Sequence, residues 1–117
     1  MSAETASAED ALLAFTDDNW EQEVLASDLP VAVGFYAEWC VPCRTVAPSL
    51  EGAAAGLVGR LRVGRLNVDE NPRVTARYKV QGLPTLLVFV HGEPVERRVG
   101  LMAREHLFGL LESLAKR

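Results

Sequence analysis

A short run of almost entirely apolar residues, Val-Ala-Val-Gly-Phe-Tyr-Ala at positions 31–37, constrains the fold more than any other feature of this chain. A strand with one face in water alternates apolar and polar residues. A continuous apolar run of this length is instead typical of a strand buried on both faces. The run therefore predicts a sheet that is covered by helices on both sides.

Hydrophobic periodicity and turn residues divide the rest of the chain into alternating strands and helices. The predicted strands are residues 11–15, 31–37, 61–68, 86–90 and 94–99, and the predicted helices are residues 16–26, 41–57, 71–78 and 103–114. His91-Gly92 is predicted to form a two-residue turn between the last two strands, and Pro48 is predicted to kink the second helix. This order is typical of an α/β domain with a mixed sheet and helices on both faces.

The chain has 117 residues, a net charge of −4, and 49% apolar residues. This composition supports one compact domain, predicted at residues 11–117, after a flexible acidic arm at residues 1–10. The negative charge argues against nucleic-acid binding, which requires clustered Lys and Arg. Residues 1–14 contain no Lys or Arg, so no export signal is predicted, and no apolar run is long enough for a membrane helix. We expect a cytoplasmic monomer, with a bacterial-type cytoplasm or an organelle matrix favoured over export.

Both cysteines lie in a single C-x-x-C sequence, Cys40 and Cys43. A small secreted domain stabilised by disulfides usually has four or more cysteines spread along the chain. The pair therefore indicates redox chemistry or metal binding. Residues three apart share one helix face, and one helical turn supplies the Cα separation of about 4.4–6.8 Å that a disulfide requires.

The position of Cys40 directly before a predicted helix indicates which thiol reacts first. Unpaired N–H groups and the positive end of the helix dipole stabilise an anion there. We therefore expect a lowered pKa for Cys40, which is the nucleophile. Pro42 lacks an N–H, which the first turn tolerates. Cys43 lies further into the helix, is expected to be less exposed, and is the resolving thiol.

Two other interpretations of the cysteine pair are a half zinc site and an inert pair of buried thiols. A zinc site needs a second pair of ligands. The only histidines are His91 in a turn and His106 on a helix, and they do not have ligand spacing. No metal ligand is therefore predicted.

Three segments together resemble the thioredoxin family. Residues 35–44 (FYAEWCVPCR) resemble its active-site segment, residues 67–72 (NVDENP) its following strand-to-helix stretch, and residues 82–85 (GLPT) its cis-proline loop. The resemblance implies the thioredoxin fold, an α/β fold with a mixed four- to five-stranded sheet and four flanking helices. It also implies reduction of protein disulfides through a mixed disulfide on Cys40, resolved by Cys43. The family needs no bound cofactor beyond this redox-active disulfide, and its partners are an NADPH-dependent thioredoxin reductase and disulfide-bearing substrate proteins.

The resemblance also assigns residues that contact substrates. Trp39 matches the exposed indole beside the nucleophile, although most tryptophans simply pack in a core. Pro84 matches the cis-proline, although most X-Pro bonds are trans. The full set of implied substrate-contact residues is Trp39, Val41, Pro42, Gly82, Leu83, Pro84, Val99 and Gly100. Gly82, Leu83, Val99 and Gly100 fit ordinary turn and packing roles equally well.

Four positions depart from the family pattern and bear on the rate and the reduction potential. Gly34 stands where the family usually has a buried Asp, and Arg65 stands where it usually has a Lys. Tyr36 replaces a Trp and Val41 replaces a Gly. Gly34 is expected to leave a small space that water fills, so that Cys43 loses its proton to water. The alternative is that Glu38 or Asp69 supplies a base.

Three functions remain open from the sequence. The first is a disulfide reductase recycled by a thioredoxin reductase. The second is an oxidase or isomerase of similar fold, and such enzymes usually carry an export signal. The third is a binding module that holds a partner on the surface around Trp39 without turnover.

Overall fold

The computed structural model describes residues 11–116, and the predicted arm at residues 1–10 lies outside them. Its five strands are β1 (Leu13–Ala14), β2 (Val31–Tyr36), β3 (Arg62–Asn67), β4 (Thr85–Val90) and β5 (Glu93–Val99), and its helices are η2 (Glu21–Leu25), α2 (Val41–Gly56), α3 (Pro72–Arg77) and α4 (Arg104–Ala115). The strand order is β1-β3-β2-β4-β5. β1, β3 and β2 are parallel, and β4 and β5 are antiparallel to their neighbours. The predicted mixed sheet is confirmed.

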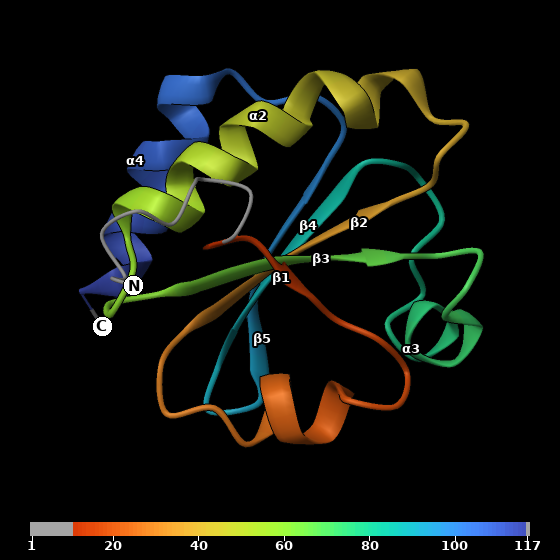
Figure 1. The fold of residues 1–117 in the computed structure, drawn as a ribbon, viewed down its shortest axis with the longest axis horizontal. Coiled ribbons are helices and arrows are strands. Elements are labelled where there is room, and N and C mark those ends of the chain that lie inside the picture. The colour runs from red at the N-terminus through yellow and green to blue at the C-terminus, as the bar shows by residue number, and fades with distance from the viewer. Residues whose placement is uncertain (1–10, 117) are drawn as a thin grey trace, which may run out of the picture.

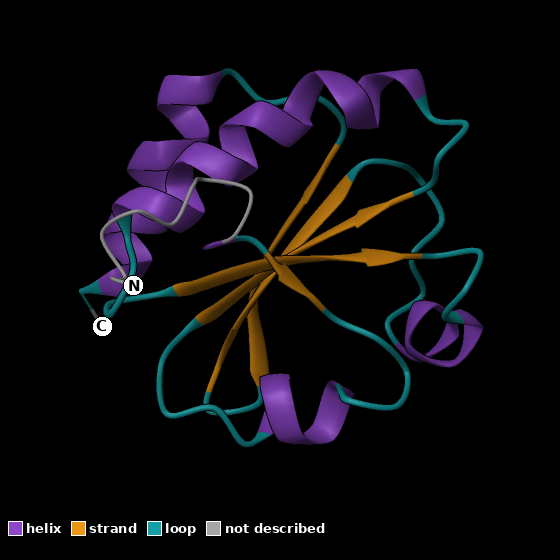
Figure 2. Cartoon of the chain, viewed as in Figure 1, coloured by secondary structure: helices purple, strands orange, loops and turns teal. Residues whose placement is uncertain are grey.

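Helices cover both faces of this sheet, with α2 and α4 on one side and η2 and α3 on the other (Figure 1). Figure 2 shows the strands as a single twisted layer between the helices. Alternate residues of β2 enter two separate cores: Ala32 packs with residues of α2 and α4, whereas Val33 and Phe35 pack with Trp20 and other aromatic residues. Because β2 is central and neither of its faces contacts water, its residues are almost all apolar.

The first helix is much shorter than the predicted 16–26. Thr16 and Asn19 exchange two hydrogen bonds, in which each backbone N–H donates to the other's side-chain oxygen at 2.8 and 3.0 Å. This closed turn uses the residues predicted to start the helix. After it comes one wide turn, η2, in which the Ala26 N–H donates to the Glu21 carbonyl five residues earlier. Trp20, directly before η2, is buried and packs edge-on against Phe89.

The predicted turn between the last two strands is confirmed. His91 and Gly92 have φ angles of 51° and 80°, and positive φ at both central residues matches the strand twist of a tight hairpin. Gly92 tolerates this conformation because it lacks a Cβ. Among residues 11–116, no helix is long and apolar enough to cross a bilayer.

Strand pairing brings four chain segments to one edge of the sheet. Tyr36, at the end of β2, pairs with Asn67 at the end of β3. Thr85, at the start of β4, pairs with Phe35 on one side and with Val99 at the end of β5 on the other. Loops that leave the carboxyl ends of parallel strands commonly form ligand sites. The C-x-x-C sequence follows β2 directly, so it lies at this edge.

Candidate active site

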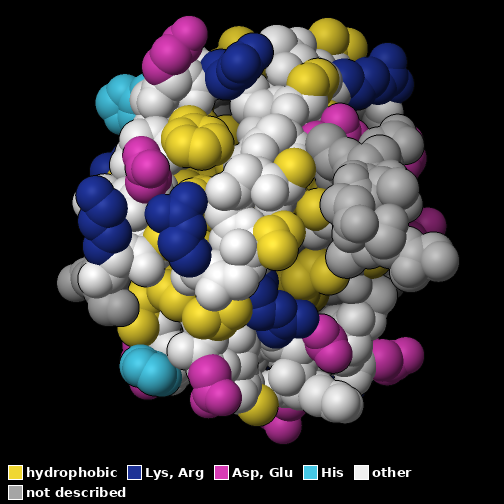
Figure 3. Space-filling model, turned by 60° about the vertical axis from the view of Figure 1, so that its left-hand side comes forward, with side chains coloured by type: hydrophobic (Ala, Val, Ile, Leu, Met, Phe, Trp, Pro, Cys, Tyr) yellow, Lys and Arg dark blue, Asp and Glu magenta, His cyan; other side chains and the backbone are white. Residues whose placement is uncertain are grey.

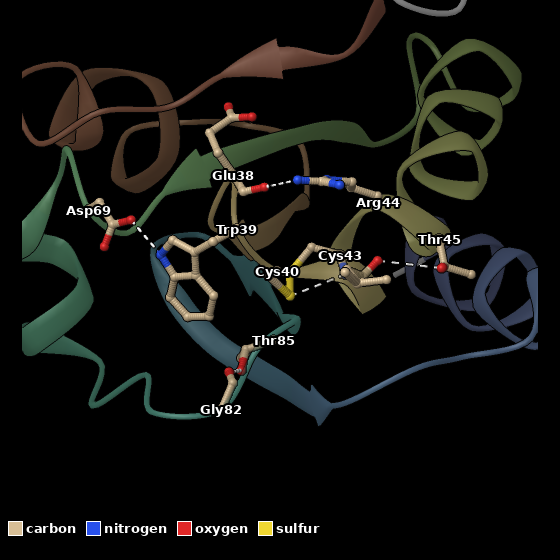
Figure 4. Close-up of a disulfide and its surroundings, with 10 residues drawn as sticks. Glu38, Trp39, Cys40, Cys43, Arg44, Thr45, Asp69, Gly82 and Thr85 are labelled. Atoms are coloured by element: carbon tan, nitrogen blue, oxygen red, sulfur yellow. Dashed lines mark hydrogen bonds between the residues drawn. A yellow bond between two sulfur atoms is a disulfide. The ribbon is translucent and has the colours of Figure 1, made fainter.

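Cys40 and Cys43 form a disulfide at the start of α2 (Figure 4). Cys40 is the N-cap residue, with extended backbone angles of φ −88° and ψ 108°, and Cys43 lies one turn into the helix. Their Cα atoms are 5.3 Å apart, within the range that one helical turn was predicted to supply. The two thiols can therefore join and separate without rearrangement of the helix.

The helix start is organised around the Cys40 sulfur. The Cys43 N–H donates to Cys40 Sγ at 3.2 Å, the bond that an N-cap side chain usually accepts. Pro42 occupies the first turn, where its missing N–H leaves no helical bond unmade. A donor aimed at Sγ and the positive end of the α2 dipole both stabilise negative charge on Cys40. The arrangement suits Cys40 to act as a thiolate.

The prediction that Cys43 is the less exposed cysteine is wrong. Cys40 is 5% exposed and Cys43 is 7% exposed, and both pack against Ala37. Cys43 lies further into the helix than Cys40 but is not more buried, because it lines a cavity beneath α2. The two sulfurs differ in their position relative to the helix start rather than in burial.

The cis-proline loop lies at the same edge of the sheet. The Leu83–Pro84 peptide bond is cis, as the resemblance implies, and the Pro84 carbonyl accepts a hydrogen bond from the Gly100 N–H at 2.8 Å. Gly82 lies so close to Val99 that a Cβ atom placed on Gly82 would be only 2.9 Å from Val99 Cγ1. Segments 82–84 and 99–100 are therefore neighbours.

Trp39 lies on the surface beside the disulfide, with 67% of its side chain exposed. Its indole Nε1–H donates to Asp69 Oδ2 at 2.9 Å, and Figure 4 shows this bond holding the ring next to Cys40. The Asp69 N–H in turn donates to Asn67 Oδ1 at 2.9 Å. The sequence did not assign this role to Asp69, because thirty positions separate it from Trp39.

Val41, Val99 and Leu101 are exposed apolar residues, and we call these three the rim. Their exposed fractions are 64%, 60% and 60%, respectively. They come from segments that strand pairing and the start of α2 bring to one edge. Leu101 was not among the predicted contact residues, because it follows the quoted motifs and lies in a loop without a periodic pattern.

On the inner side, beneath α2, a cavity of about 220 Å³ reaches the dithiol. Its lining includes Gly34, Cys43, Leu50, Arg65 and Met102. The small space expected at Gly34 is partly filled, because a Cβ there would lie 2.7 Å from Leu50 Cδ1. The leucine takes part of the volume that a larger residue at position 34 would occupy.

The other inner-side departures from the family pattern lie beside Gly34. Arg65 is its partner across the β2–β3 pair, and the Arg65 guanidinium lies over the Tyr36 ring at 4.6 Å. Glu38, one of the alternative bases, is exposed, and Asp69, the other, is bound to Trp39 at the surface. In Figure 4 the Glu38 carboxylate points away from the two sulfurs. Its backbone carbonyl accepts from Arg44 at 2.6 Å.

Among the described residues, no further metal ligands accompany the cysteine pair. Within residues 11–116, no three His, Cys, Asp or Glu side chains are grouped so that they could hold a metal ion. His91 lies in the β4–β5 turn and His106 lies on α4. Cys40 and Cys43 form a disulfide with each other.

Comparison with known proteins agrees with this geometry. The thioredoxin family model matches residues 11–113. The chain belongs to the thioredoxin family. It is 44% identical over 104 residues to a thioredoxin of Acidithiobacillus ferridurans, covering 89% of this chain and 96% of the relative. It is 43% identical over 97 residues to thioredoxin 1 of a Nostoc species, covering 83% and 91% of the two chains. It is 42% identical over 92 residues to a thioredoxin of Rickettsia bellii, covering 79% and 88%.

The fold is thus the thioredoxin fold, and the chemistry is thiol–disulfide exchange. The redox group is the Cys40–Cys43 disulfide itself. As in other members of the thioredoxin family, the oxidoreductase function depends on the protein's own side chains.

Proposed function

We propose that the chain reduces disulfides in other proteins, with Cys40 as the nucleophile and Cys43 as the resolving thiol. The observation that carries this assignment is the N-cap position of Cys40, whose sulfur accepts the Cys43 N–H. The thiolate is the reactive form of cysteine, and a helix start lowers the thiol pKa. Cys43 has no equivalent position, because it lies within the first turn.

The reaction proceeds in two exchanges. In the reduced protein, the Cys40 thiolate attacks one sulfur of the substrate disulfide, and the other substrate sulfur leaves as a thiolate. Cys43 then loses its proton and attacks Cys40 Sγ, which releases the second substrate sulfur. The substrate gains two electrons and, after protonation, two thiols. The protein ends with the Cys40–Cys43 disulfide.

Substrate proteins are proposed to dock on the rim and on the cis-proline loop. The proposed contact residues around Cys40 are Trp39, Val41 and Pro42, which are its neighbours in the chain. The others belong to the adjoining segments 82–84 and 99–100: Gly82, Leu83, Pro84, Val99 and Gly100. Exposed apolar side chains next to a reactive group form a surface on which a partner chain can exclude water. Leu83 packs against the two cysteines, so a substrate segment on the cis-proline loop would lie close to the dithiol.

The oxidised protein needs a source of two electrons to turn over. We propose an NADPH-dependent thioredoxin reductase as this partner, a cytoplasmic location, and a monomer whose domain covers residues 11–117. The resemblance of the active-site segment, together with relatives of similar length, supports these assignments.

The test is coupled turnover. NADPH, a bacterial thioredoxin reductase and a disulfide-bonded reporter protein are mixed with catalytic amounts of the chain. We expect NADPH oxidation that requires both the chain and the reporter and that is absent with C40S. A stable one-to-one complex with the reporter, without NADPH oxidation, would instead support the binding module. Turnover only in the direction of disulfide formation would support the oxidase.

A further inference from the structure

Two arginine side chains contact Tyr78, directly after α3, and a lysine follows it in the chain. The Arg77 guanidinium lies 5.3 Å from the centre of the Tyr78 ring, and Arg97 Nη2 donates to the Tyr78 carbonyl at 2.6 Å. Lys79 is the next residue along the chain and is exposed, as is Arg77. We call Arg77, Lys79 and Arg97 the Tyr78 basic cluster.

The cluster is unusual in a chain whose net charge is −4. Among residues 11–116, none of its three members forms an ion pair with a carboxylate. Neighbouring arginines do: Arg73 on α3 pairs with Asp17 and Asp18, and Arg98 on β5 pairs with Glu96. On the face shown in Figure 3, Lys and Arg side chains lie among Asp and Glu. The three positive charges of the Tyr78 basic cluster are therefore not neutralised by an ion pair among the described residues.

Strand geometry places this cluster beside the proposed substrate surface. Arg97 and Val99 are two residues apart on β5, so they project from the same face about 7 Å apart. Val99 is part of the rim and contacts Gly82 of the cis-proline loop. Residues 80–81 connect the cluster to this loop along the chain.

Acidic residues lie around Trp39. Glu38 and Glu70 are exposed near Trp39, and Asp69 binds the indole directly. Arg44 also lies here, where it donates to the Glu38 carbonyl. Arg65, over the Tyr36 ring, adds a second guanidinium, so three carboxylates face two basic groups here. The surroundings of Trp39 therefore have a small excess of negative charge, whereas the Tyr78 basic cluster is positive.

We propose that the Tyr78 basic cluster selects partner proteins with acidic residues on the side of the disulfide that lies over Val99. This inference rests on the proposed function, because it assumes that a substrate segment occupies the rim. Exposed charges contribute little to affinity once salt screens them, but complementary charges raise association rates and reject partners of the wrong sign. The cluster acts on kcat/KM and leaves the chemistry of the dithiol unchanged.

The experiment compares two disulfide-bonded peptides of equal length that differ only in three residues beyond the disulfide, glutamates in one and glutamines in the other. At low salt, about 20 mM, we expect reduction of the acidic peptide with a kcat/KM about three- to tenfold higher. The preference should shrink towards unity at about 500 mM salt. R77Q/K79Q should lose most of the preference while reducing the glutamine peptide at the wild-type rate.

R60Q/K116Q is the matched control, because it removes two exposed charges that lie far along the sequence from the rim segments. This control should keep the preference, which separates the cluster from a general change in net charge. R97Q removes a third charge, but also the hydrogen bond to Tyr78, so it is combined with R77Q/K79Q only if the triple variant melts cooperatively.

Equal rates for the two peptides with the wild-type protein at low salt would overturn the inference. Equal loss of preference in R77Q/K79Q and in R60Q/K116Q would also overturn it, because the effect would then come from overall charge. If neither peptide is reduced at any salt concentration, the proposed function itself fails. The glutamine peptide is measured first, because its reduction tests the proposed function independently of the charge preference.

Discussion

The two sides of the dithiol differ in how closely they follow the family to which the chain belongs. The outer side has the exposed Trp39, the cis-proline loop and an apolar rim, as the resemblance to thioredoxins implies. The inner side, beneath α2, has Gly34 against Leu50, and Arg65 stacked on Tyr36. We infer that the outer side determines which disulfides reach Cys40, and that the inner side determines how fast Cys43 resolves them.

The roles inferred for the two sides account for this difference. Only side chains that are already on the surface can exclude water from a contact with a partner chain, so the rim needs exposed apolar groups. The inner side faces Cys43 and the cavity beneath α2, and its packing can change while the outer side is kept. Leu50 is part of this packing, because its methyl group lies next to Gly34.

Removing either sulfur gives the largest expected effect. C40S should lower disulfide reduction by about a thousandfold or more, because the nucleophile at the helix start is lost. C43S should attack substrates but accumulate mixed disulfides on Cys40, because the resolving exchange is missing. Mass spectrometry of both variants after mixing with a disulfide-bonded protein checks the roles. T45S, on the same helix, should retain activity. Stable adducts on Cys43 in C40S, with none on Cys40 in C43S, would reverse the assignment.

A carboxylate on the inner side should give the next largest effect. G34D places an acid beside Cys43 and next to Arg65 across the strand pair, so we expect about a threefold to tenfold faster resolving step near neutral pH. The new Cβ displaces Leu50 and the charge is largely buried, so stability should fall by about 1–3 kcal/mol. Stopped-flow reduction of a model disulfide and a thermal melt measure both effects.

G34A separates the two causes, because it adds the Cβ without the charge. It should lose part of the stability and leave the resolving rate unchanged. An unchanged resolving rate in a well-folded G34D would mean that proton loss from Cys43 does not limit this protein, and the contrast between the two sides would then concern packing alone.

A smaller effect is expected from the group that holds Trp39. D69A removes the acceptor of the indole Nε1–H, and a typical hydrogen bond contributes about 0.5–1.5 kcal/mol. We expect KM for protein disulfides to rise about two- to fivefold with little change in kcat, by the same energy scale. D69N keeps an acceptor oxygen and should restore most of the wild-type KM. A fall in kcat with D69A at constant KM would place Asp69 in the chemistry and not in docking.

Local patterns predicted most of the fold and the reactive pair. The central strand, the hairpin turn at His91-Gly92 and the start of α2 depend on residues near one another in sequence. The first helix was predicted too long, because the reciprocal bonds of Thr16 and Asn19 compete with helix formation and leave no periodic signal. Composition and periodicity could not reveal which side chains fill a given space.

Contacts between distant segments explain what the sequence missed at the site. The Asp69 bond to Trp39 and the Leu50 contact at Gly34 both join elements that only the folded sheet brings together. The relative burial of Cys40 and Cys43 was predicted wrongly for the same reason. Helix position alone carries no information on the cavity that Cys43 lines.

The alkylation rate of each thiol in the reduced protein, measured as a function of pH, tests most directly whether the start of α2 makes Cys40 the nucleophile. Iodoacetamide is added in short pulses across the acidic to alkaline range, and fragmentation mass spectrometry locates the adduct on Cys40 or Cys43. We predict faster alkylation of Cys40 near neutral pH, with a midpoint below the free-thiol pKa of about 8.5, and a higher midpoint for Cys43. Faster alkylation of Cys43 near neutral pH would contradict this central claim.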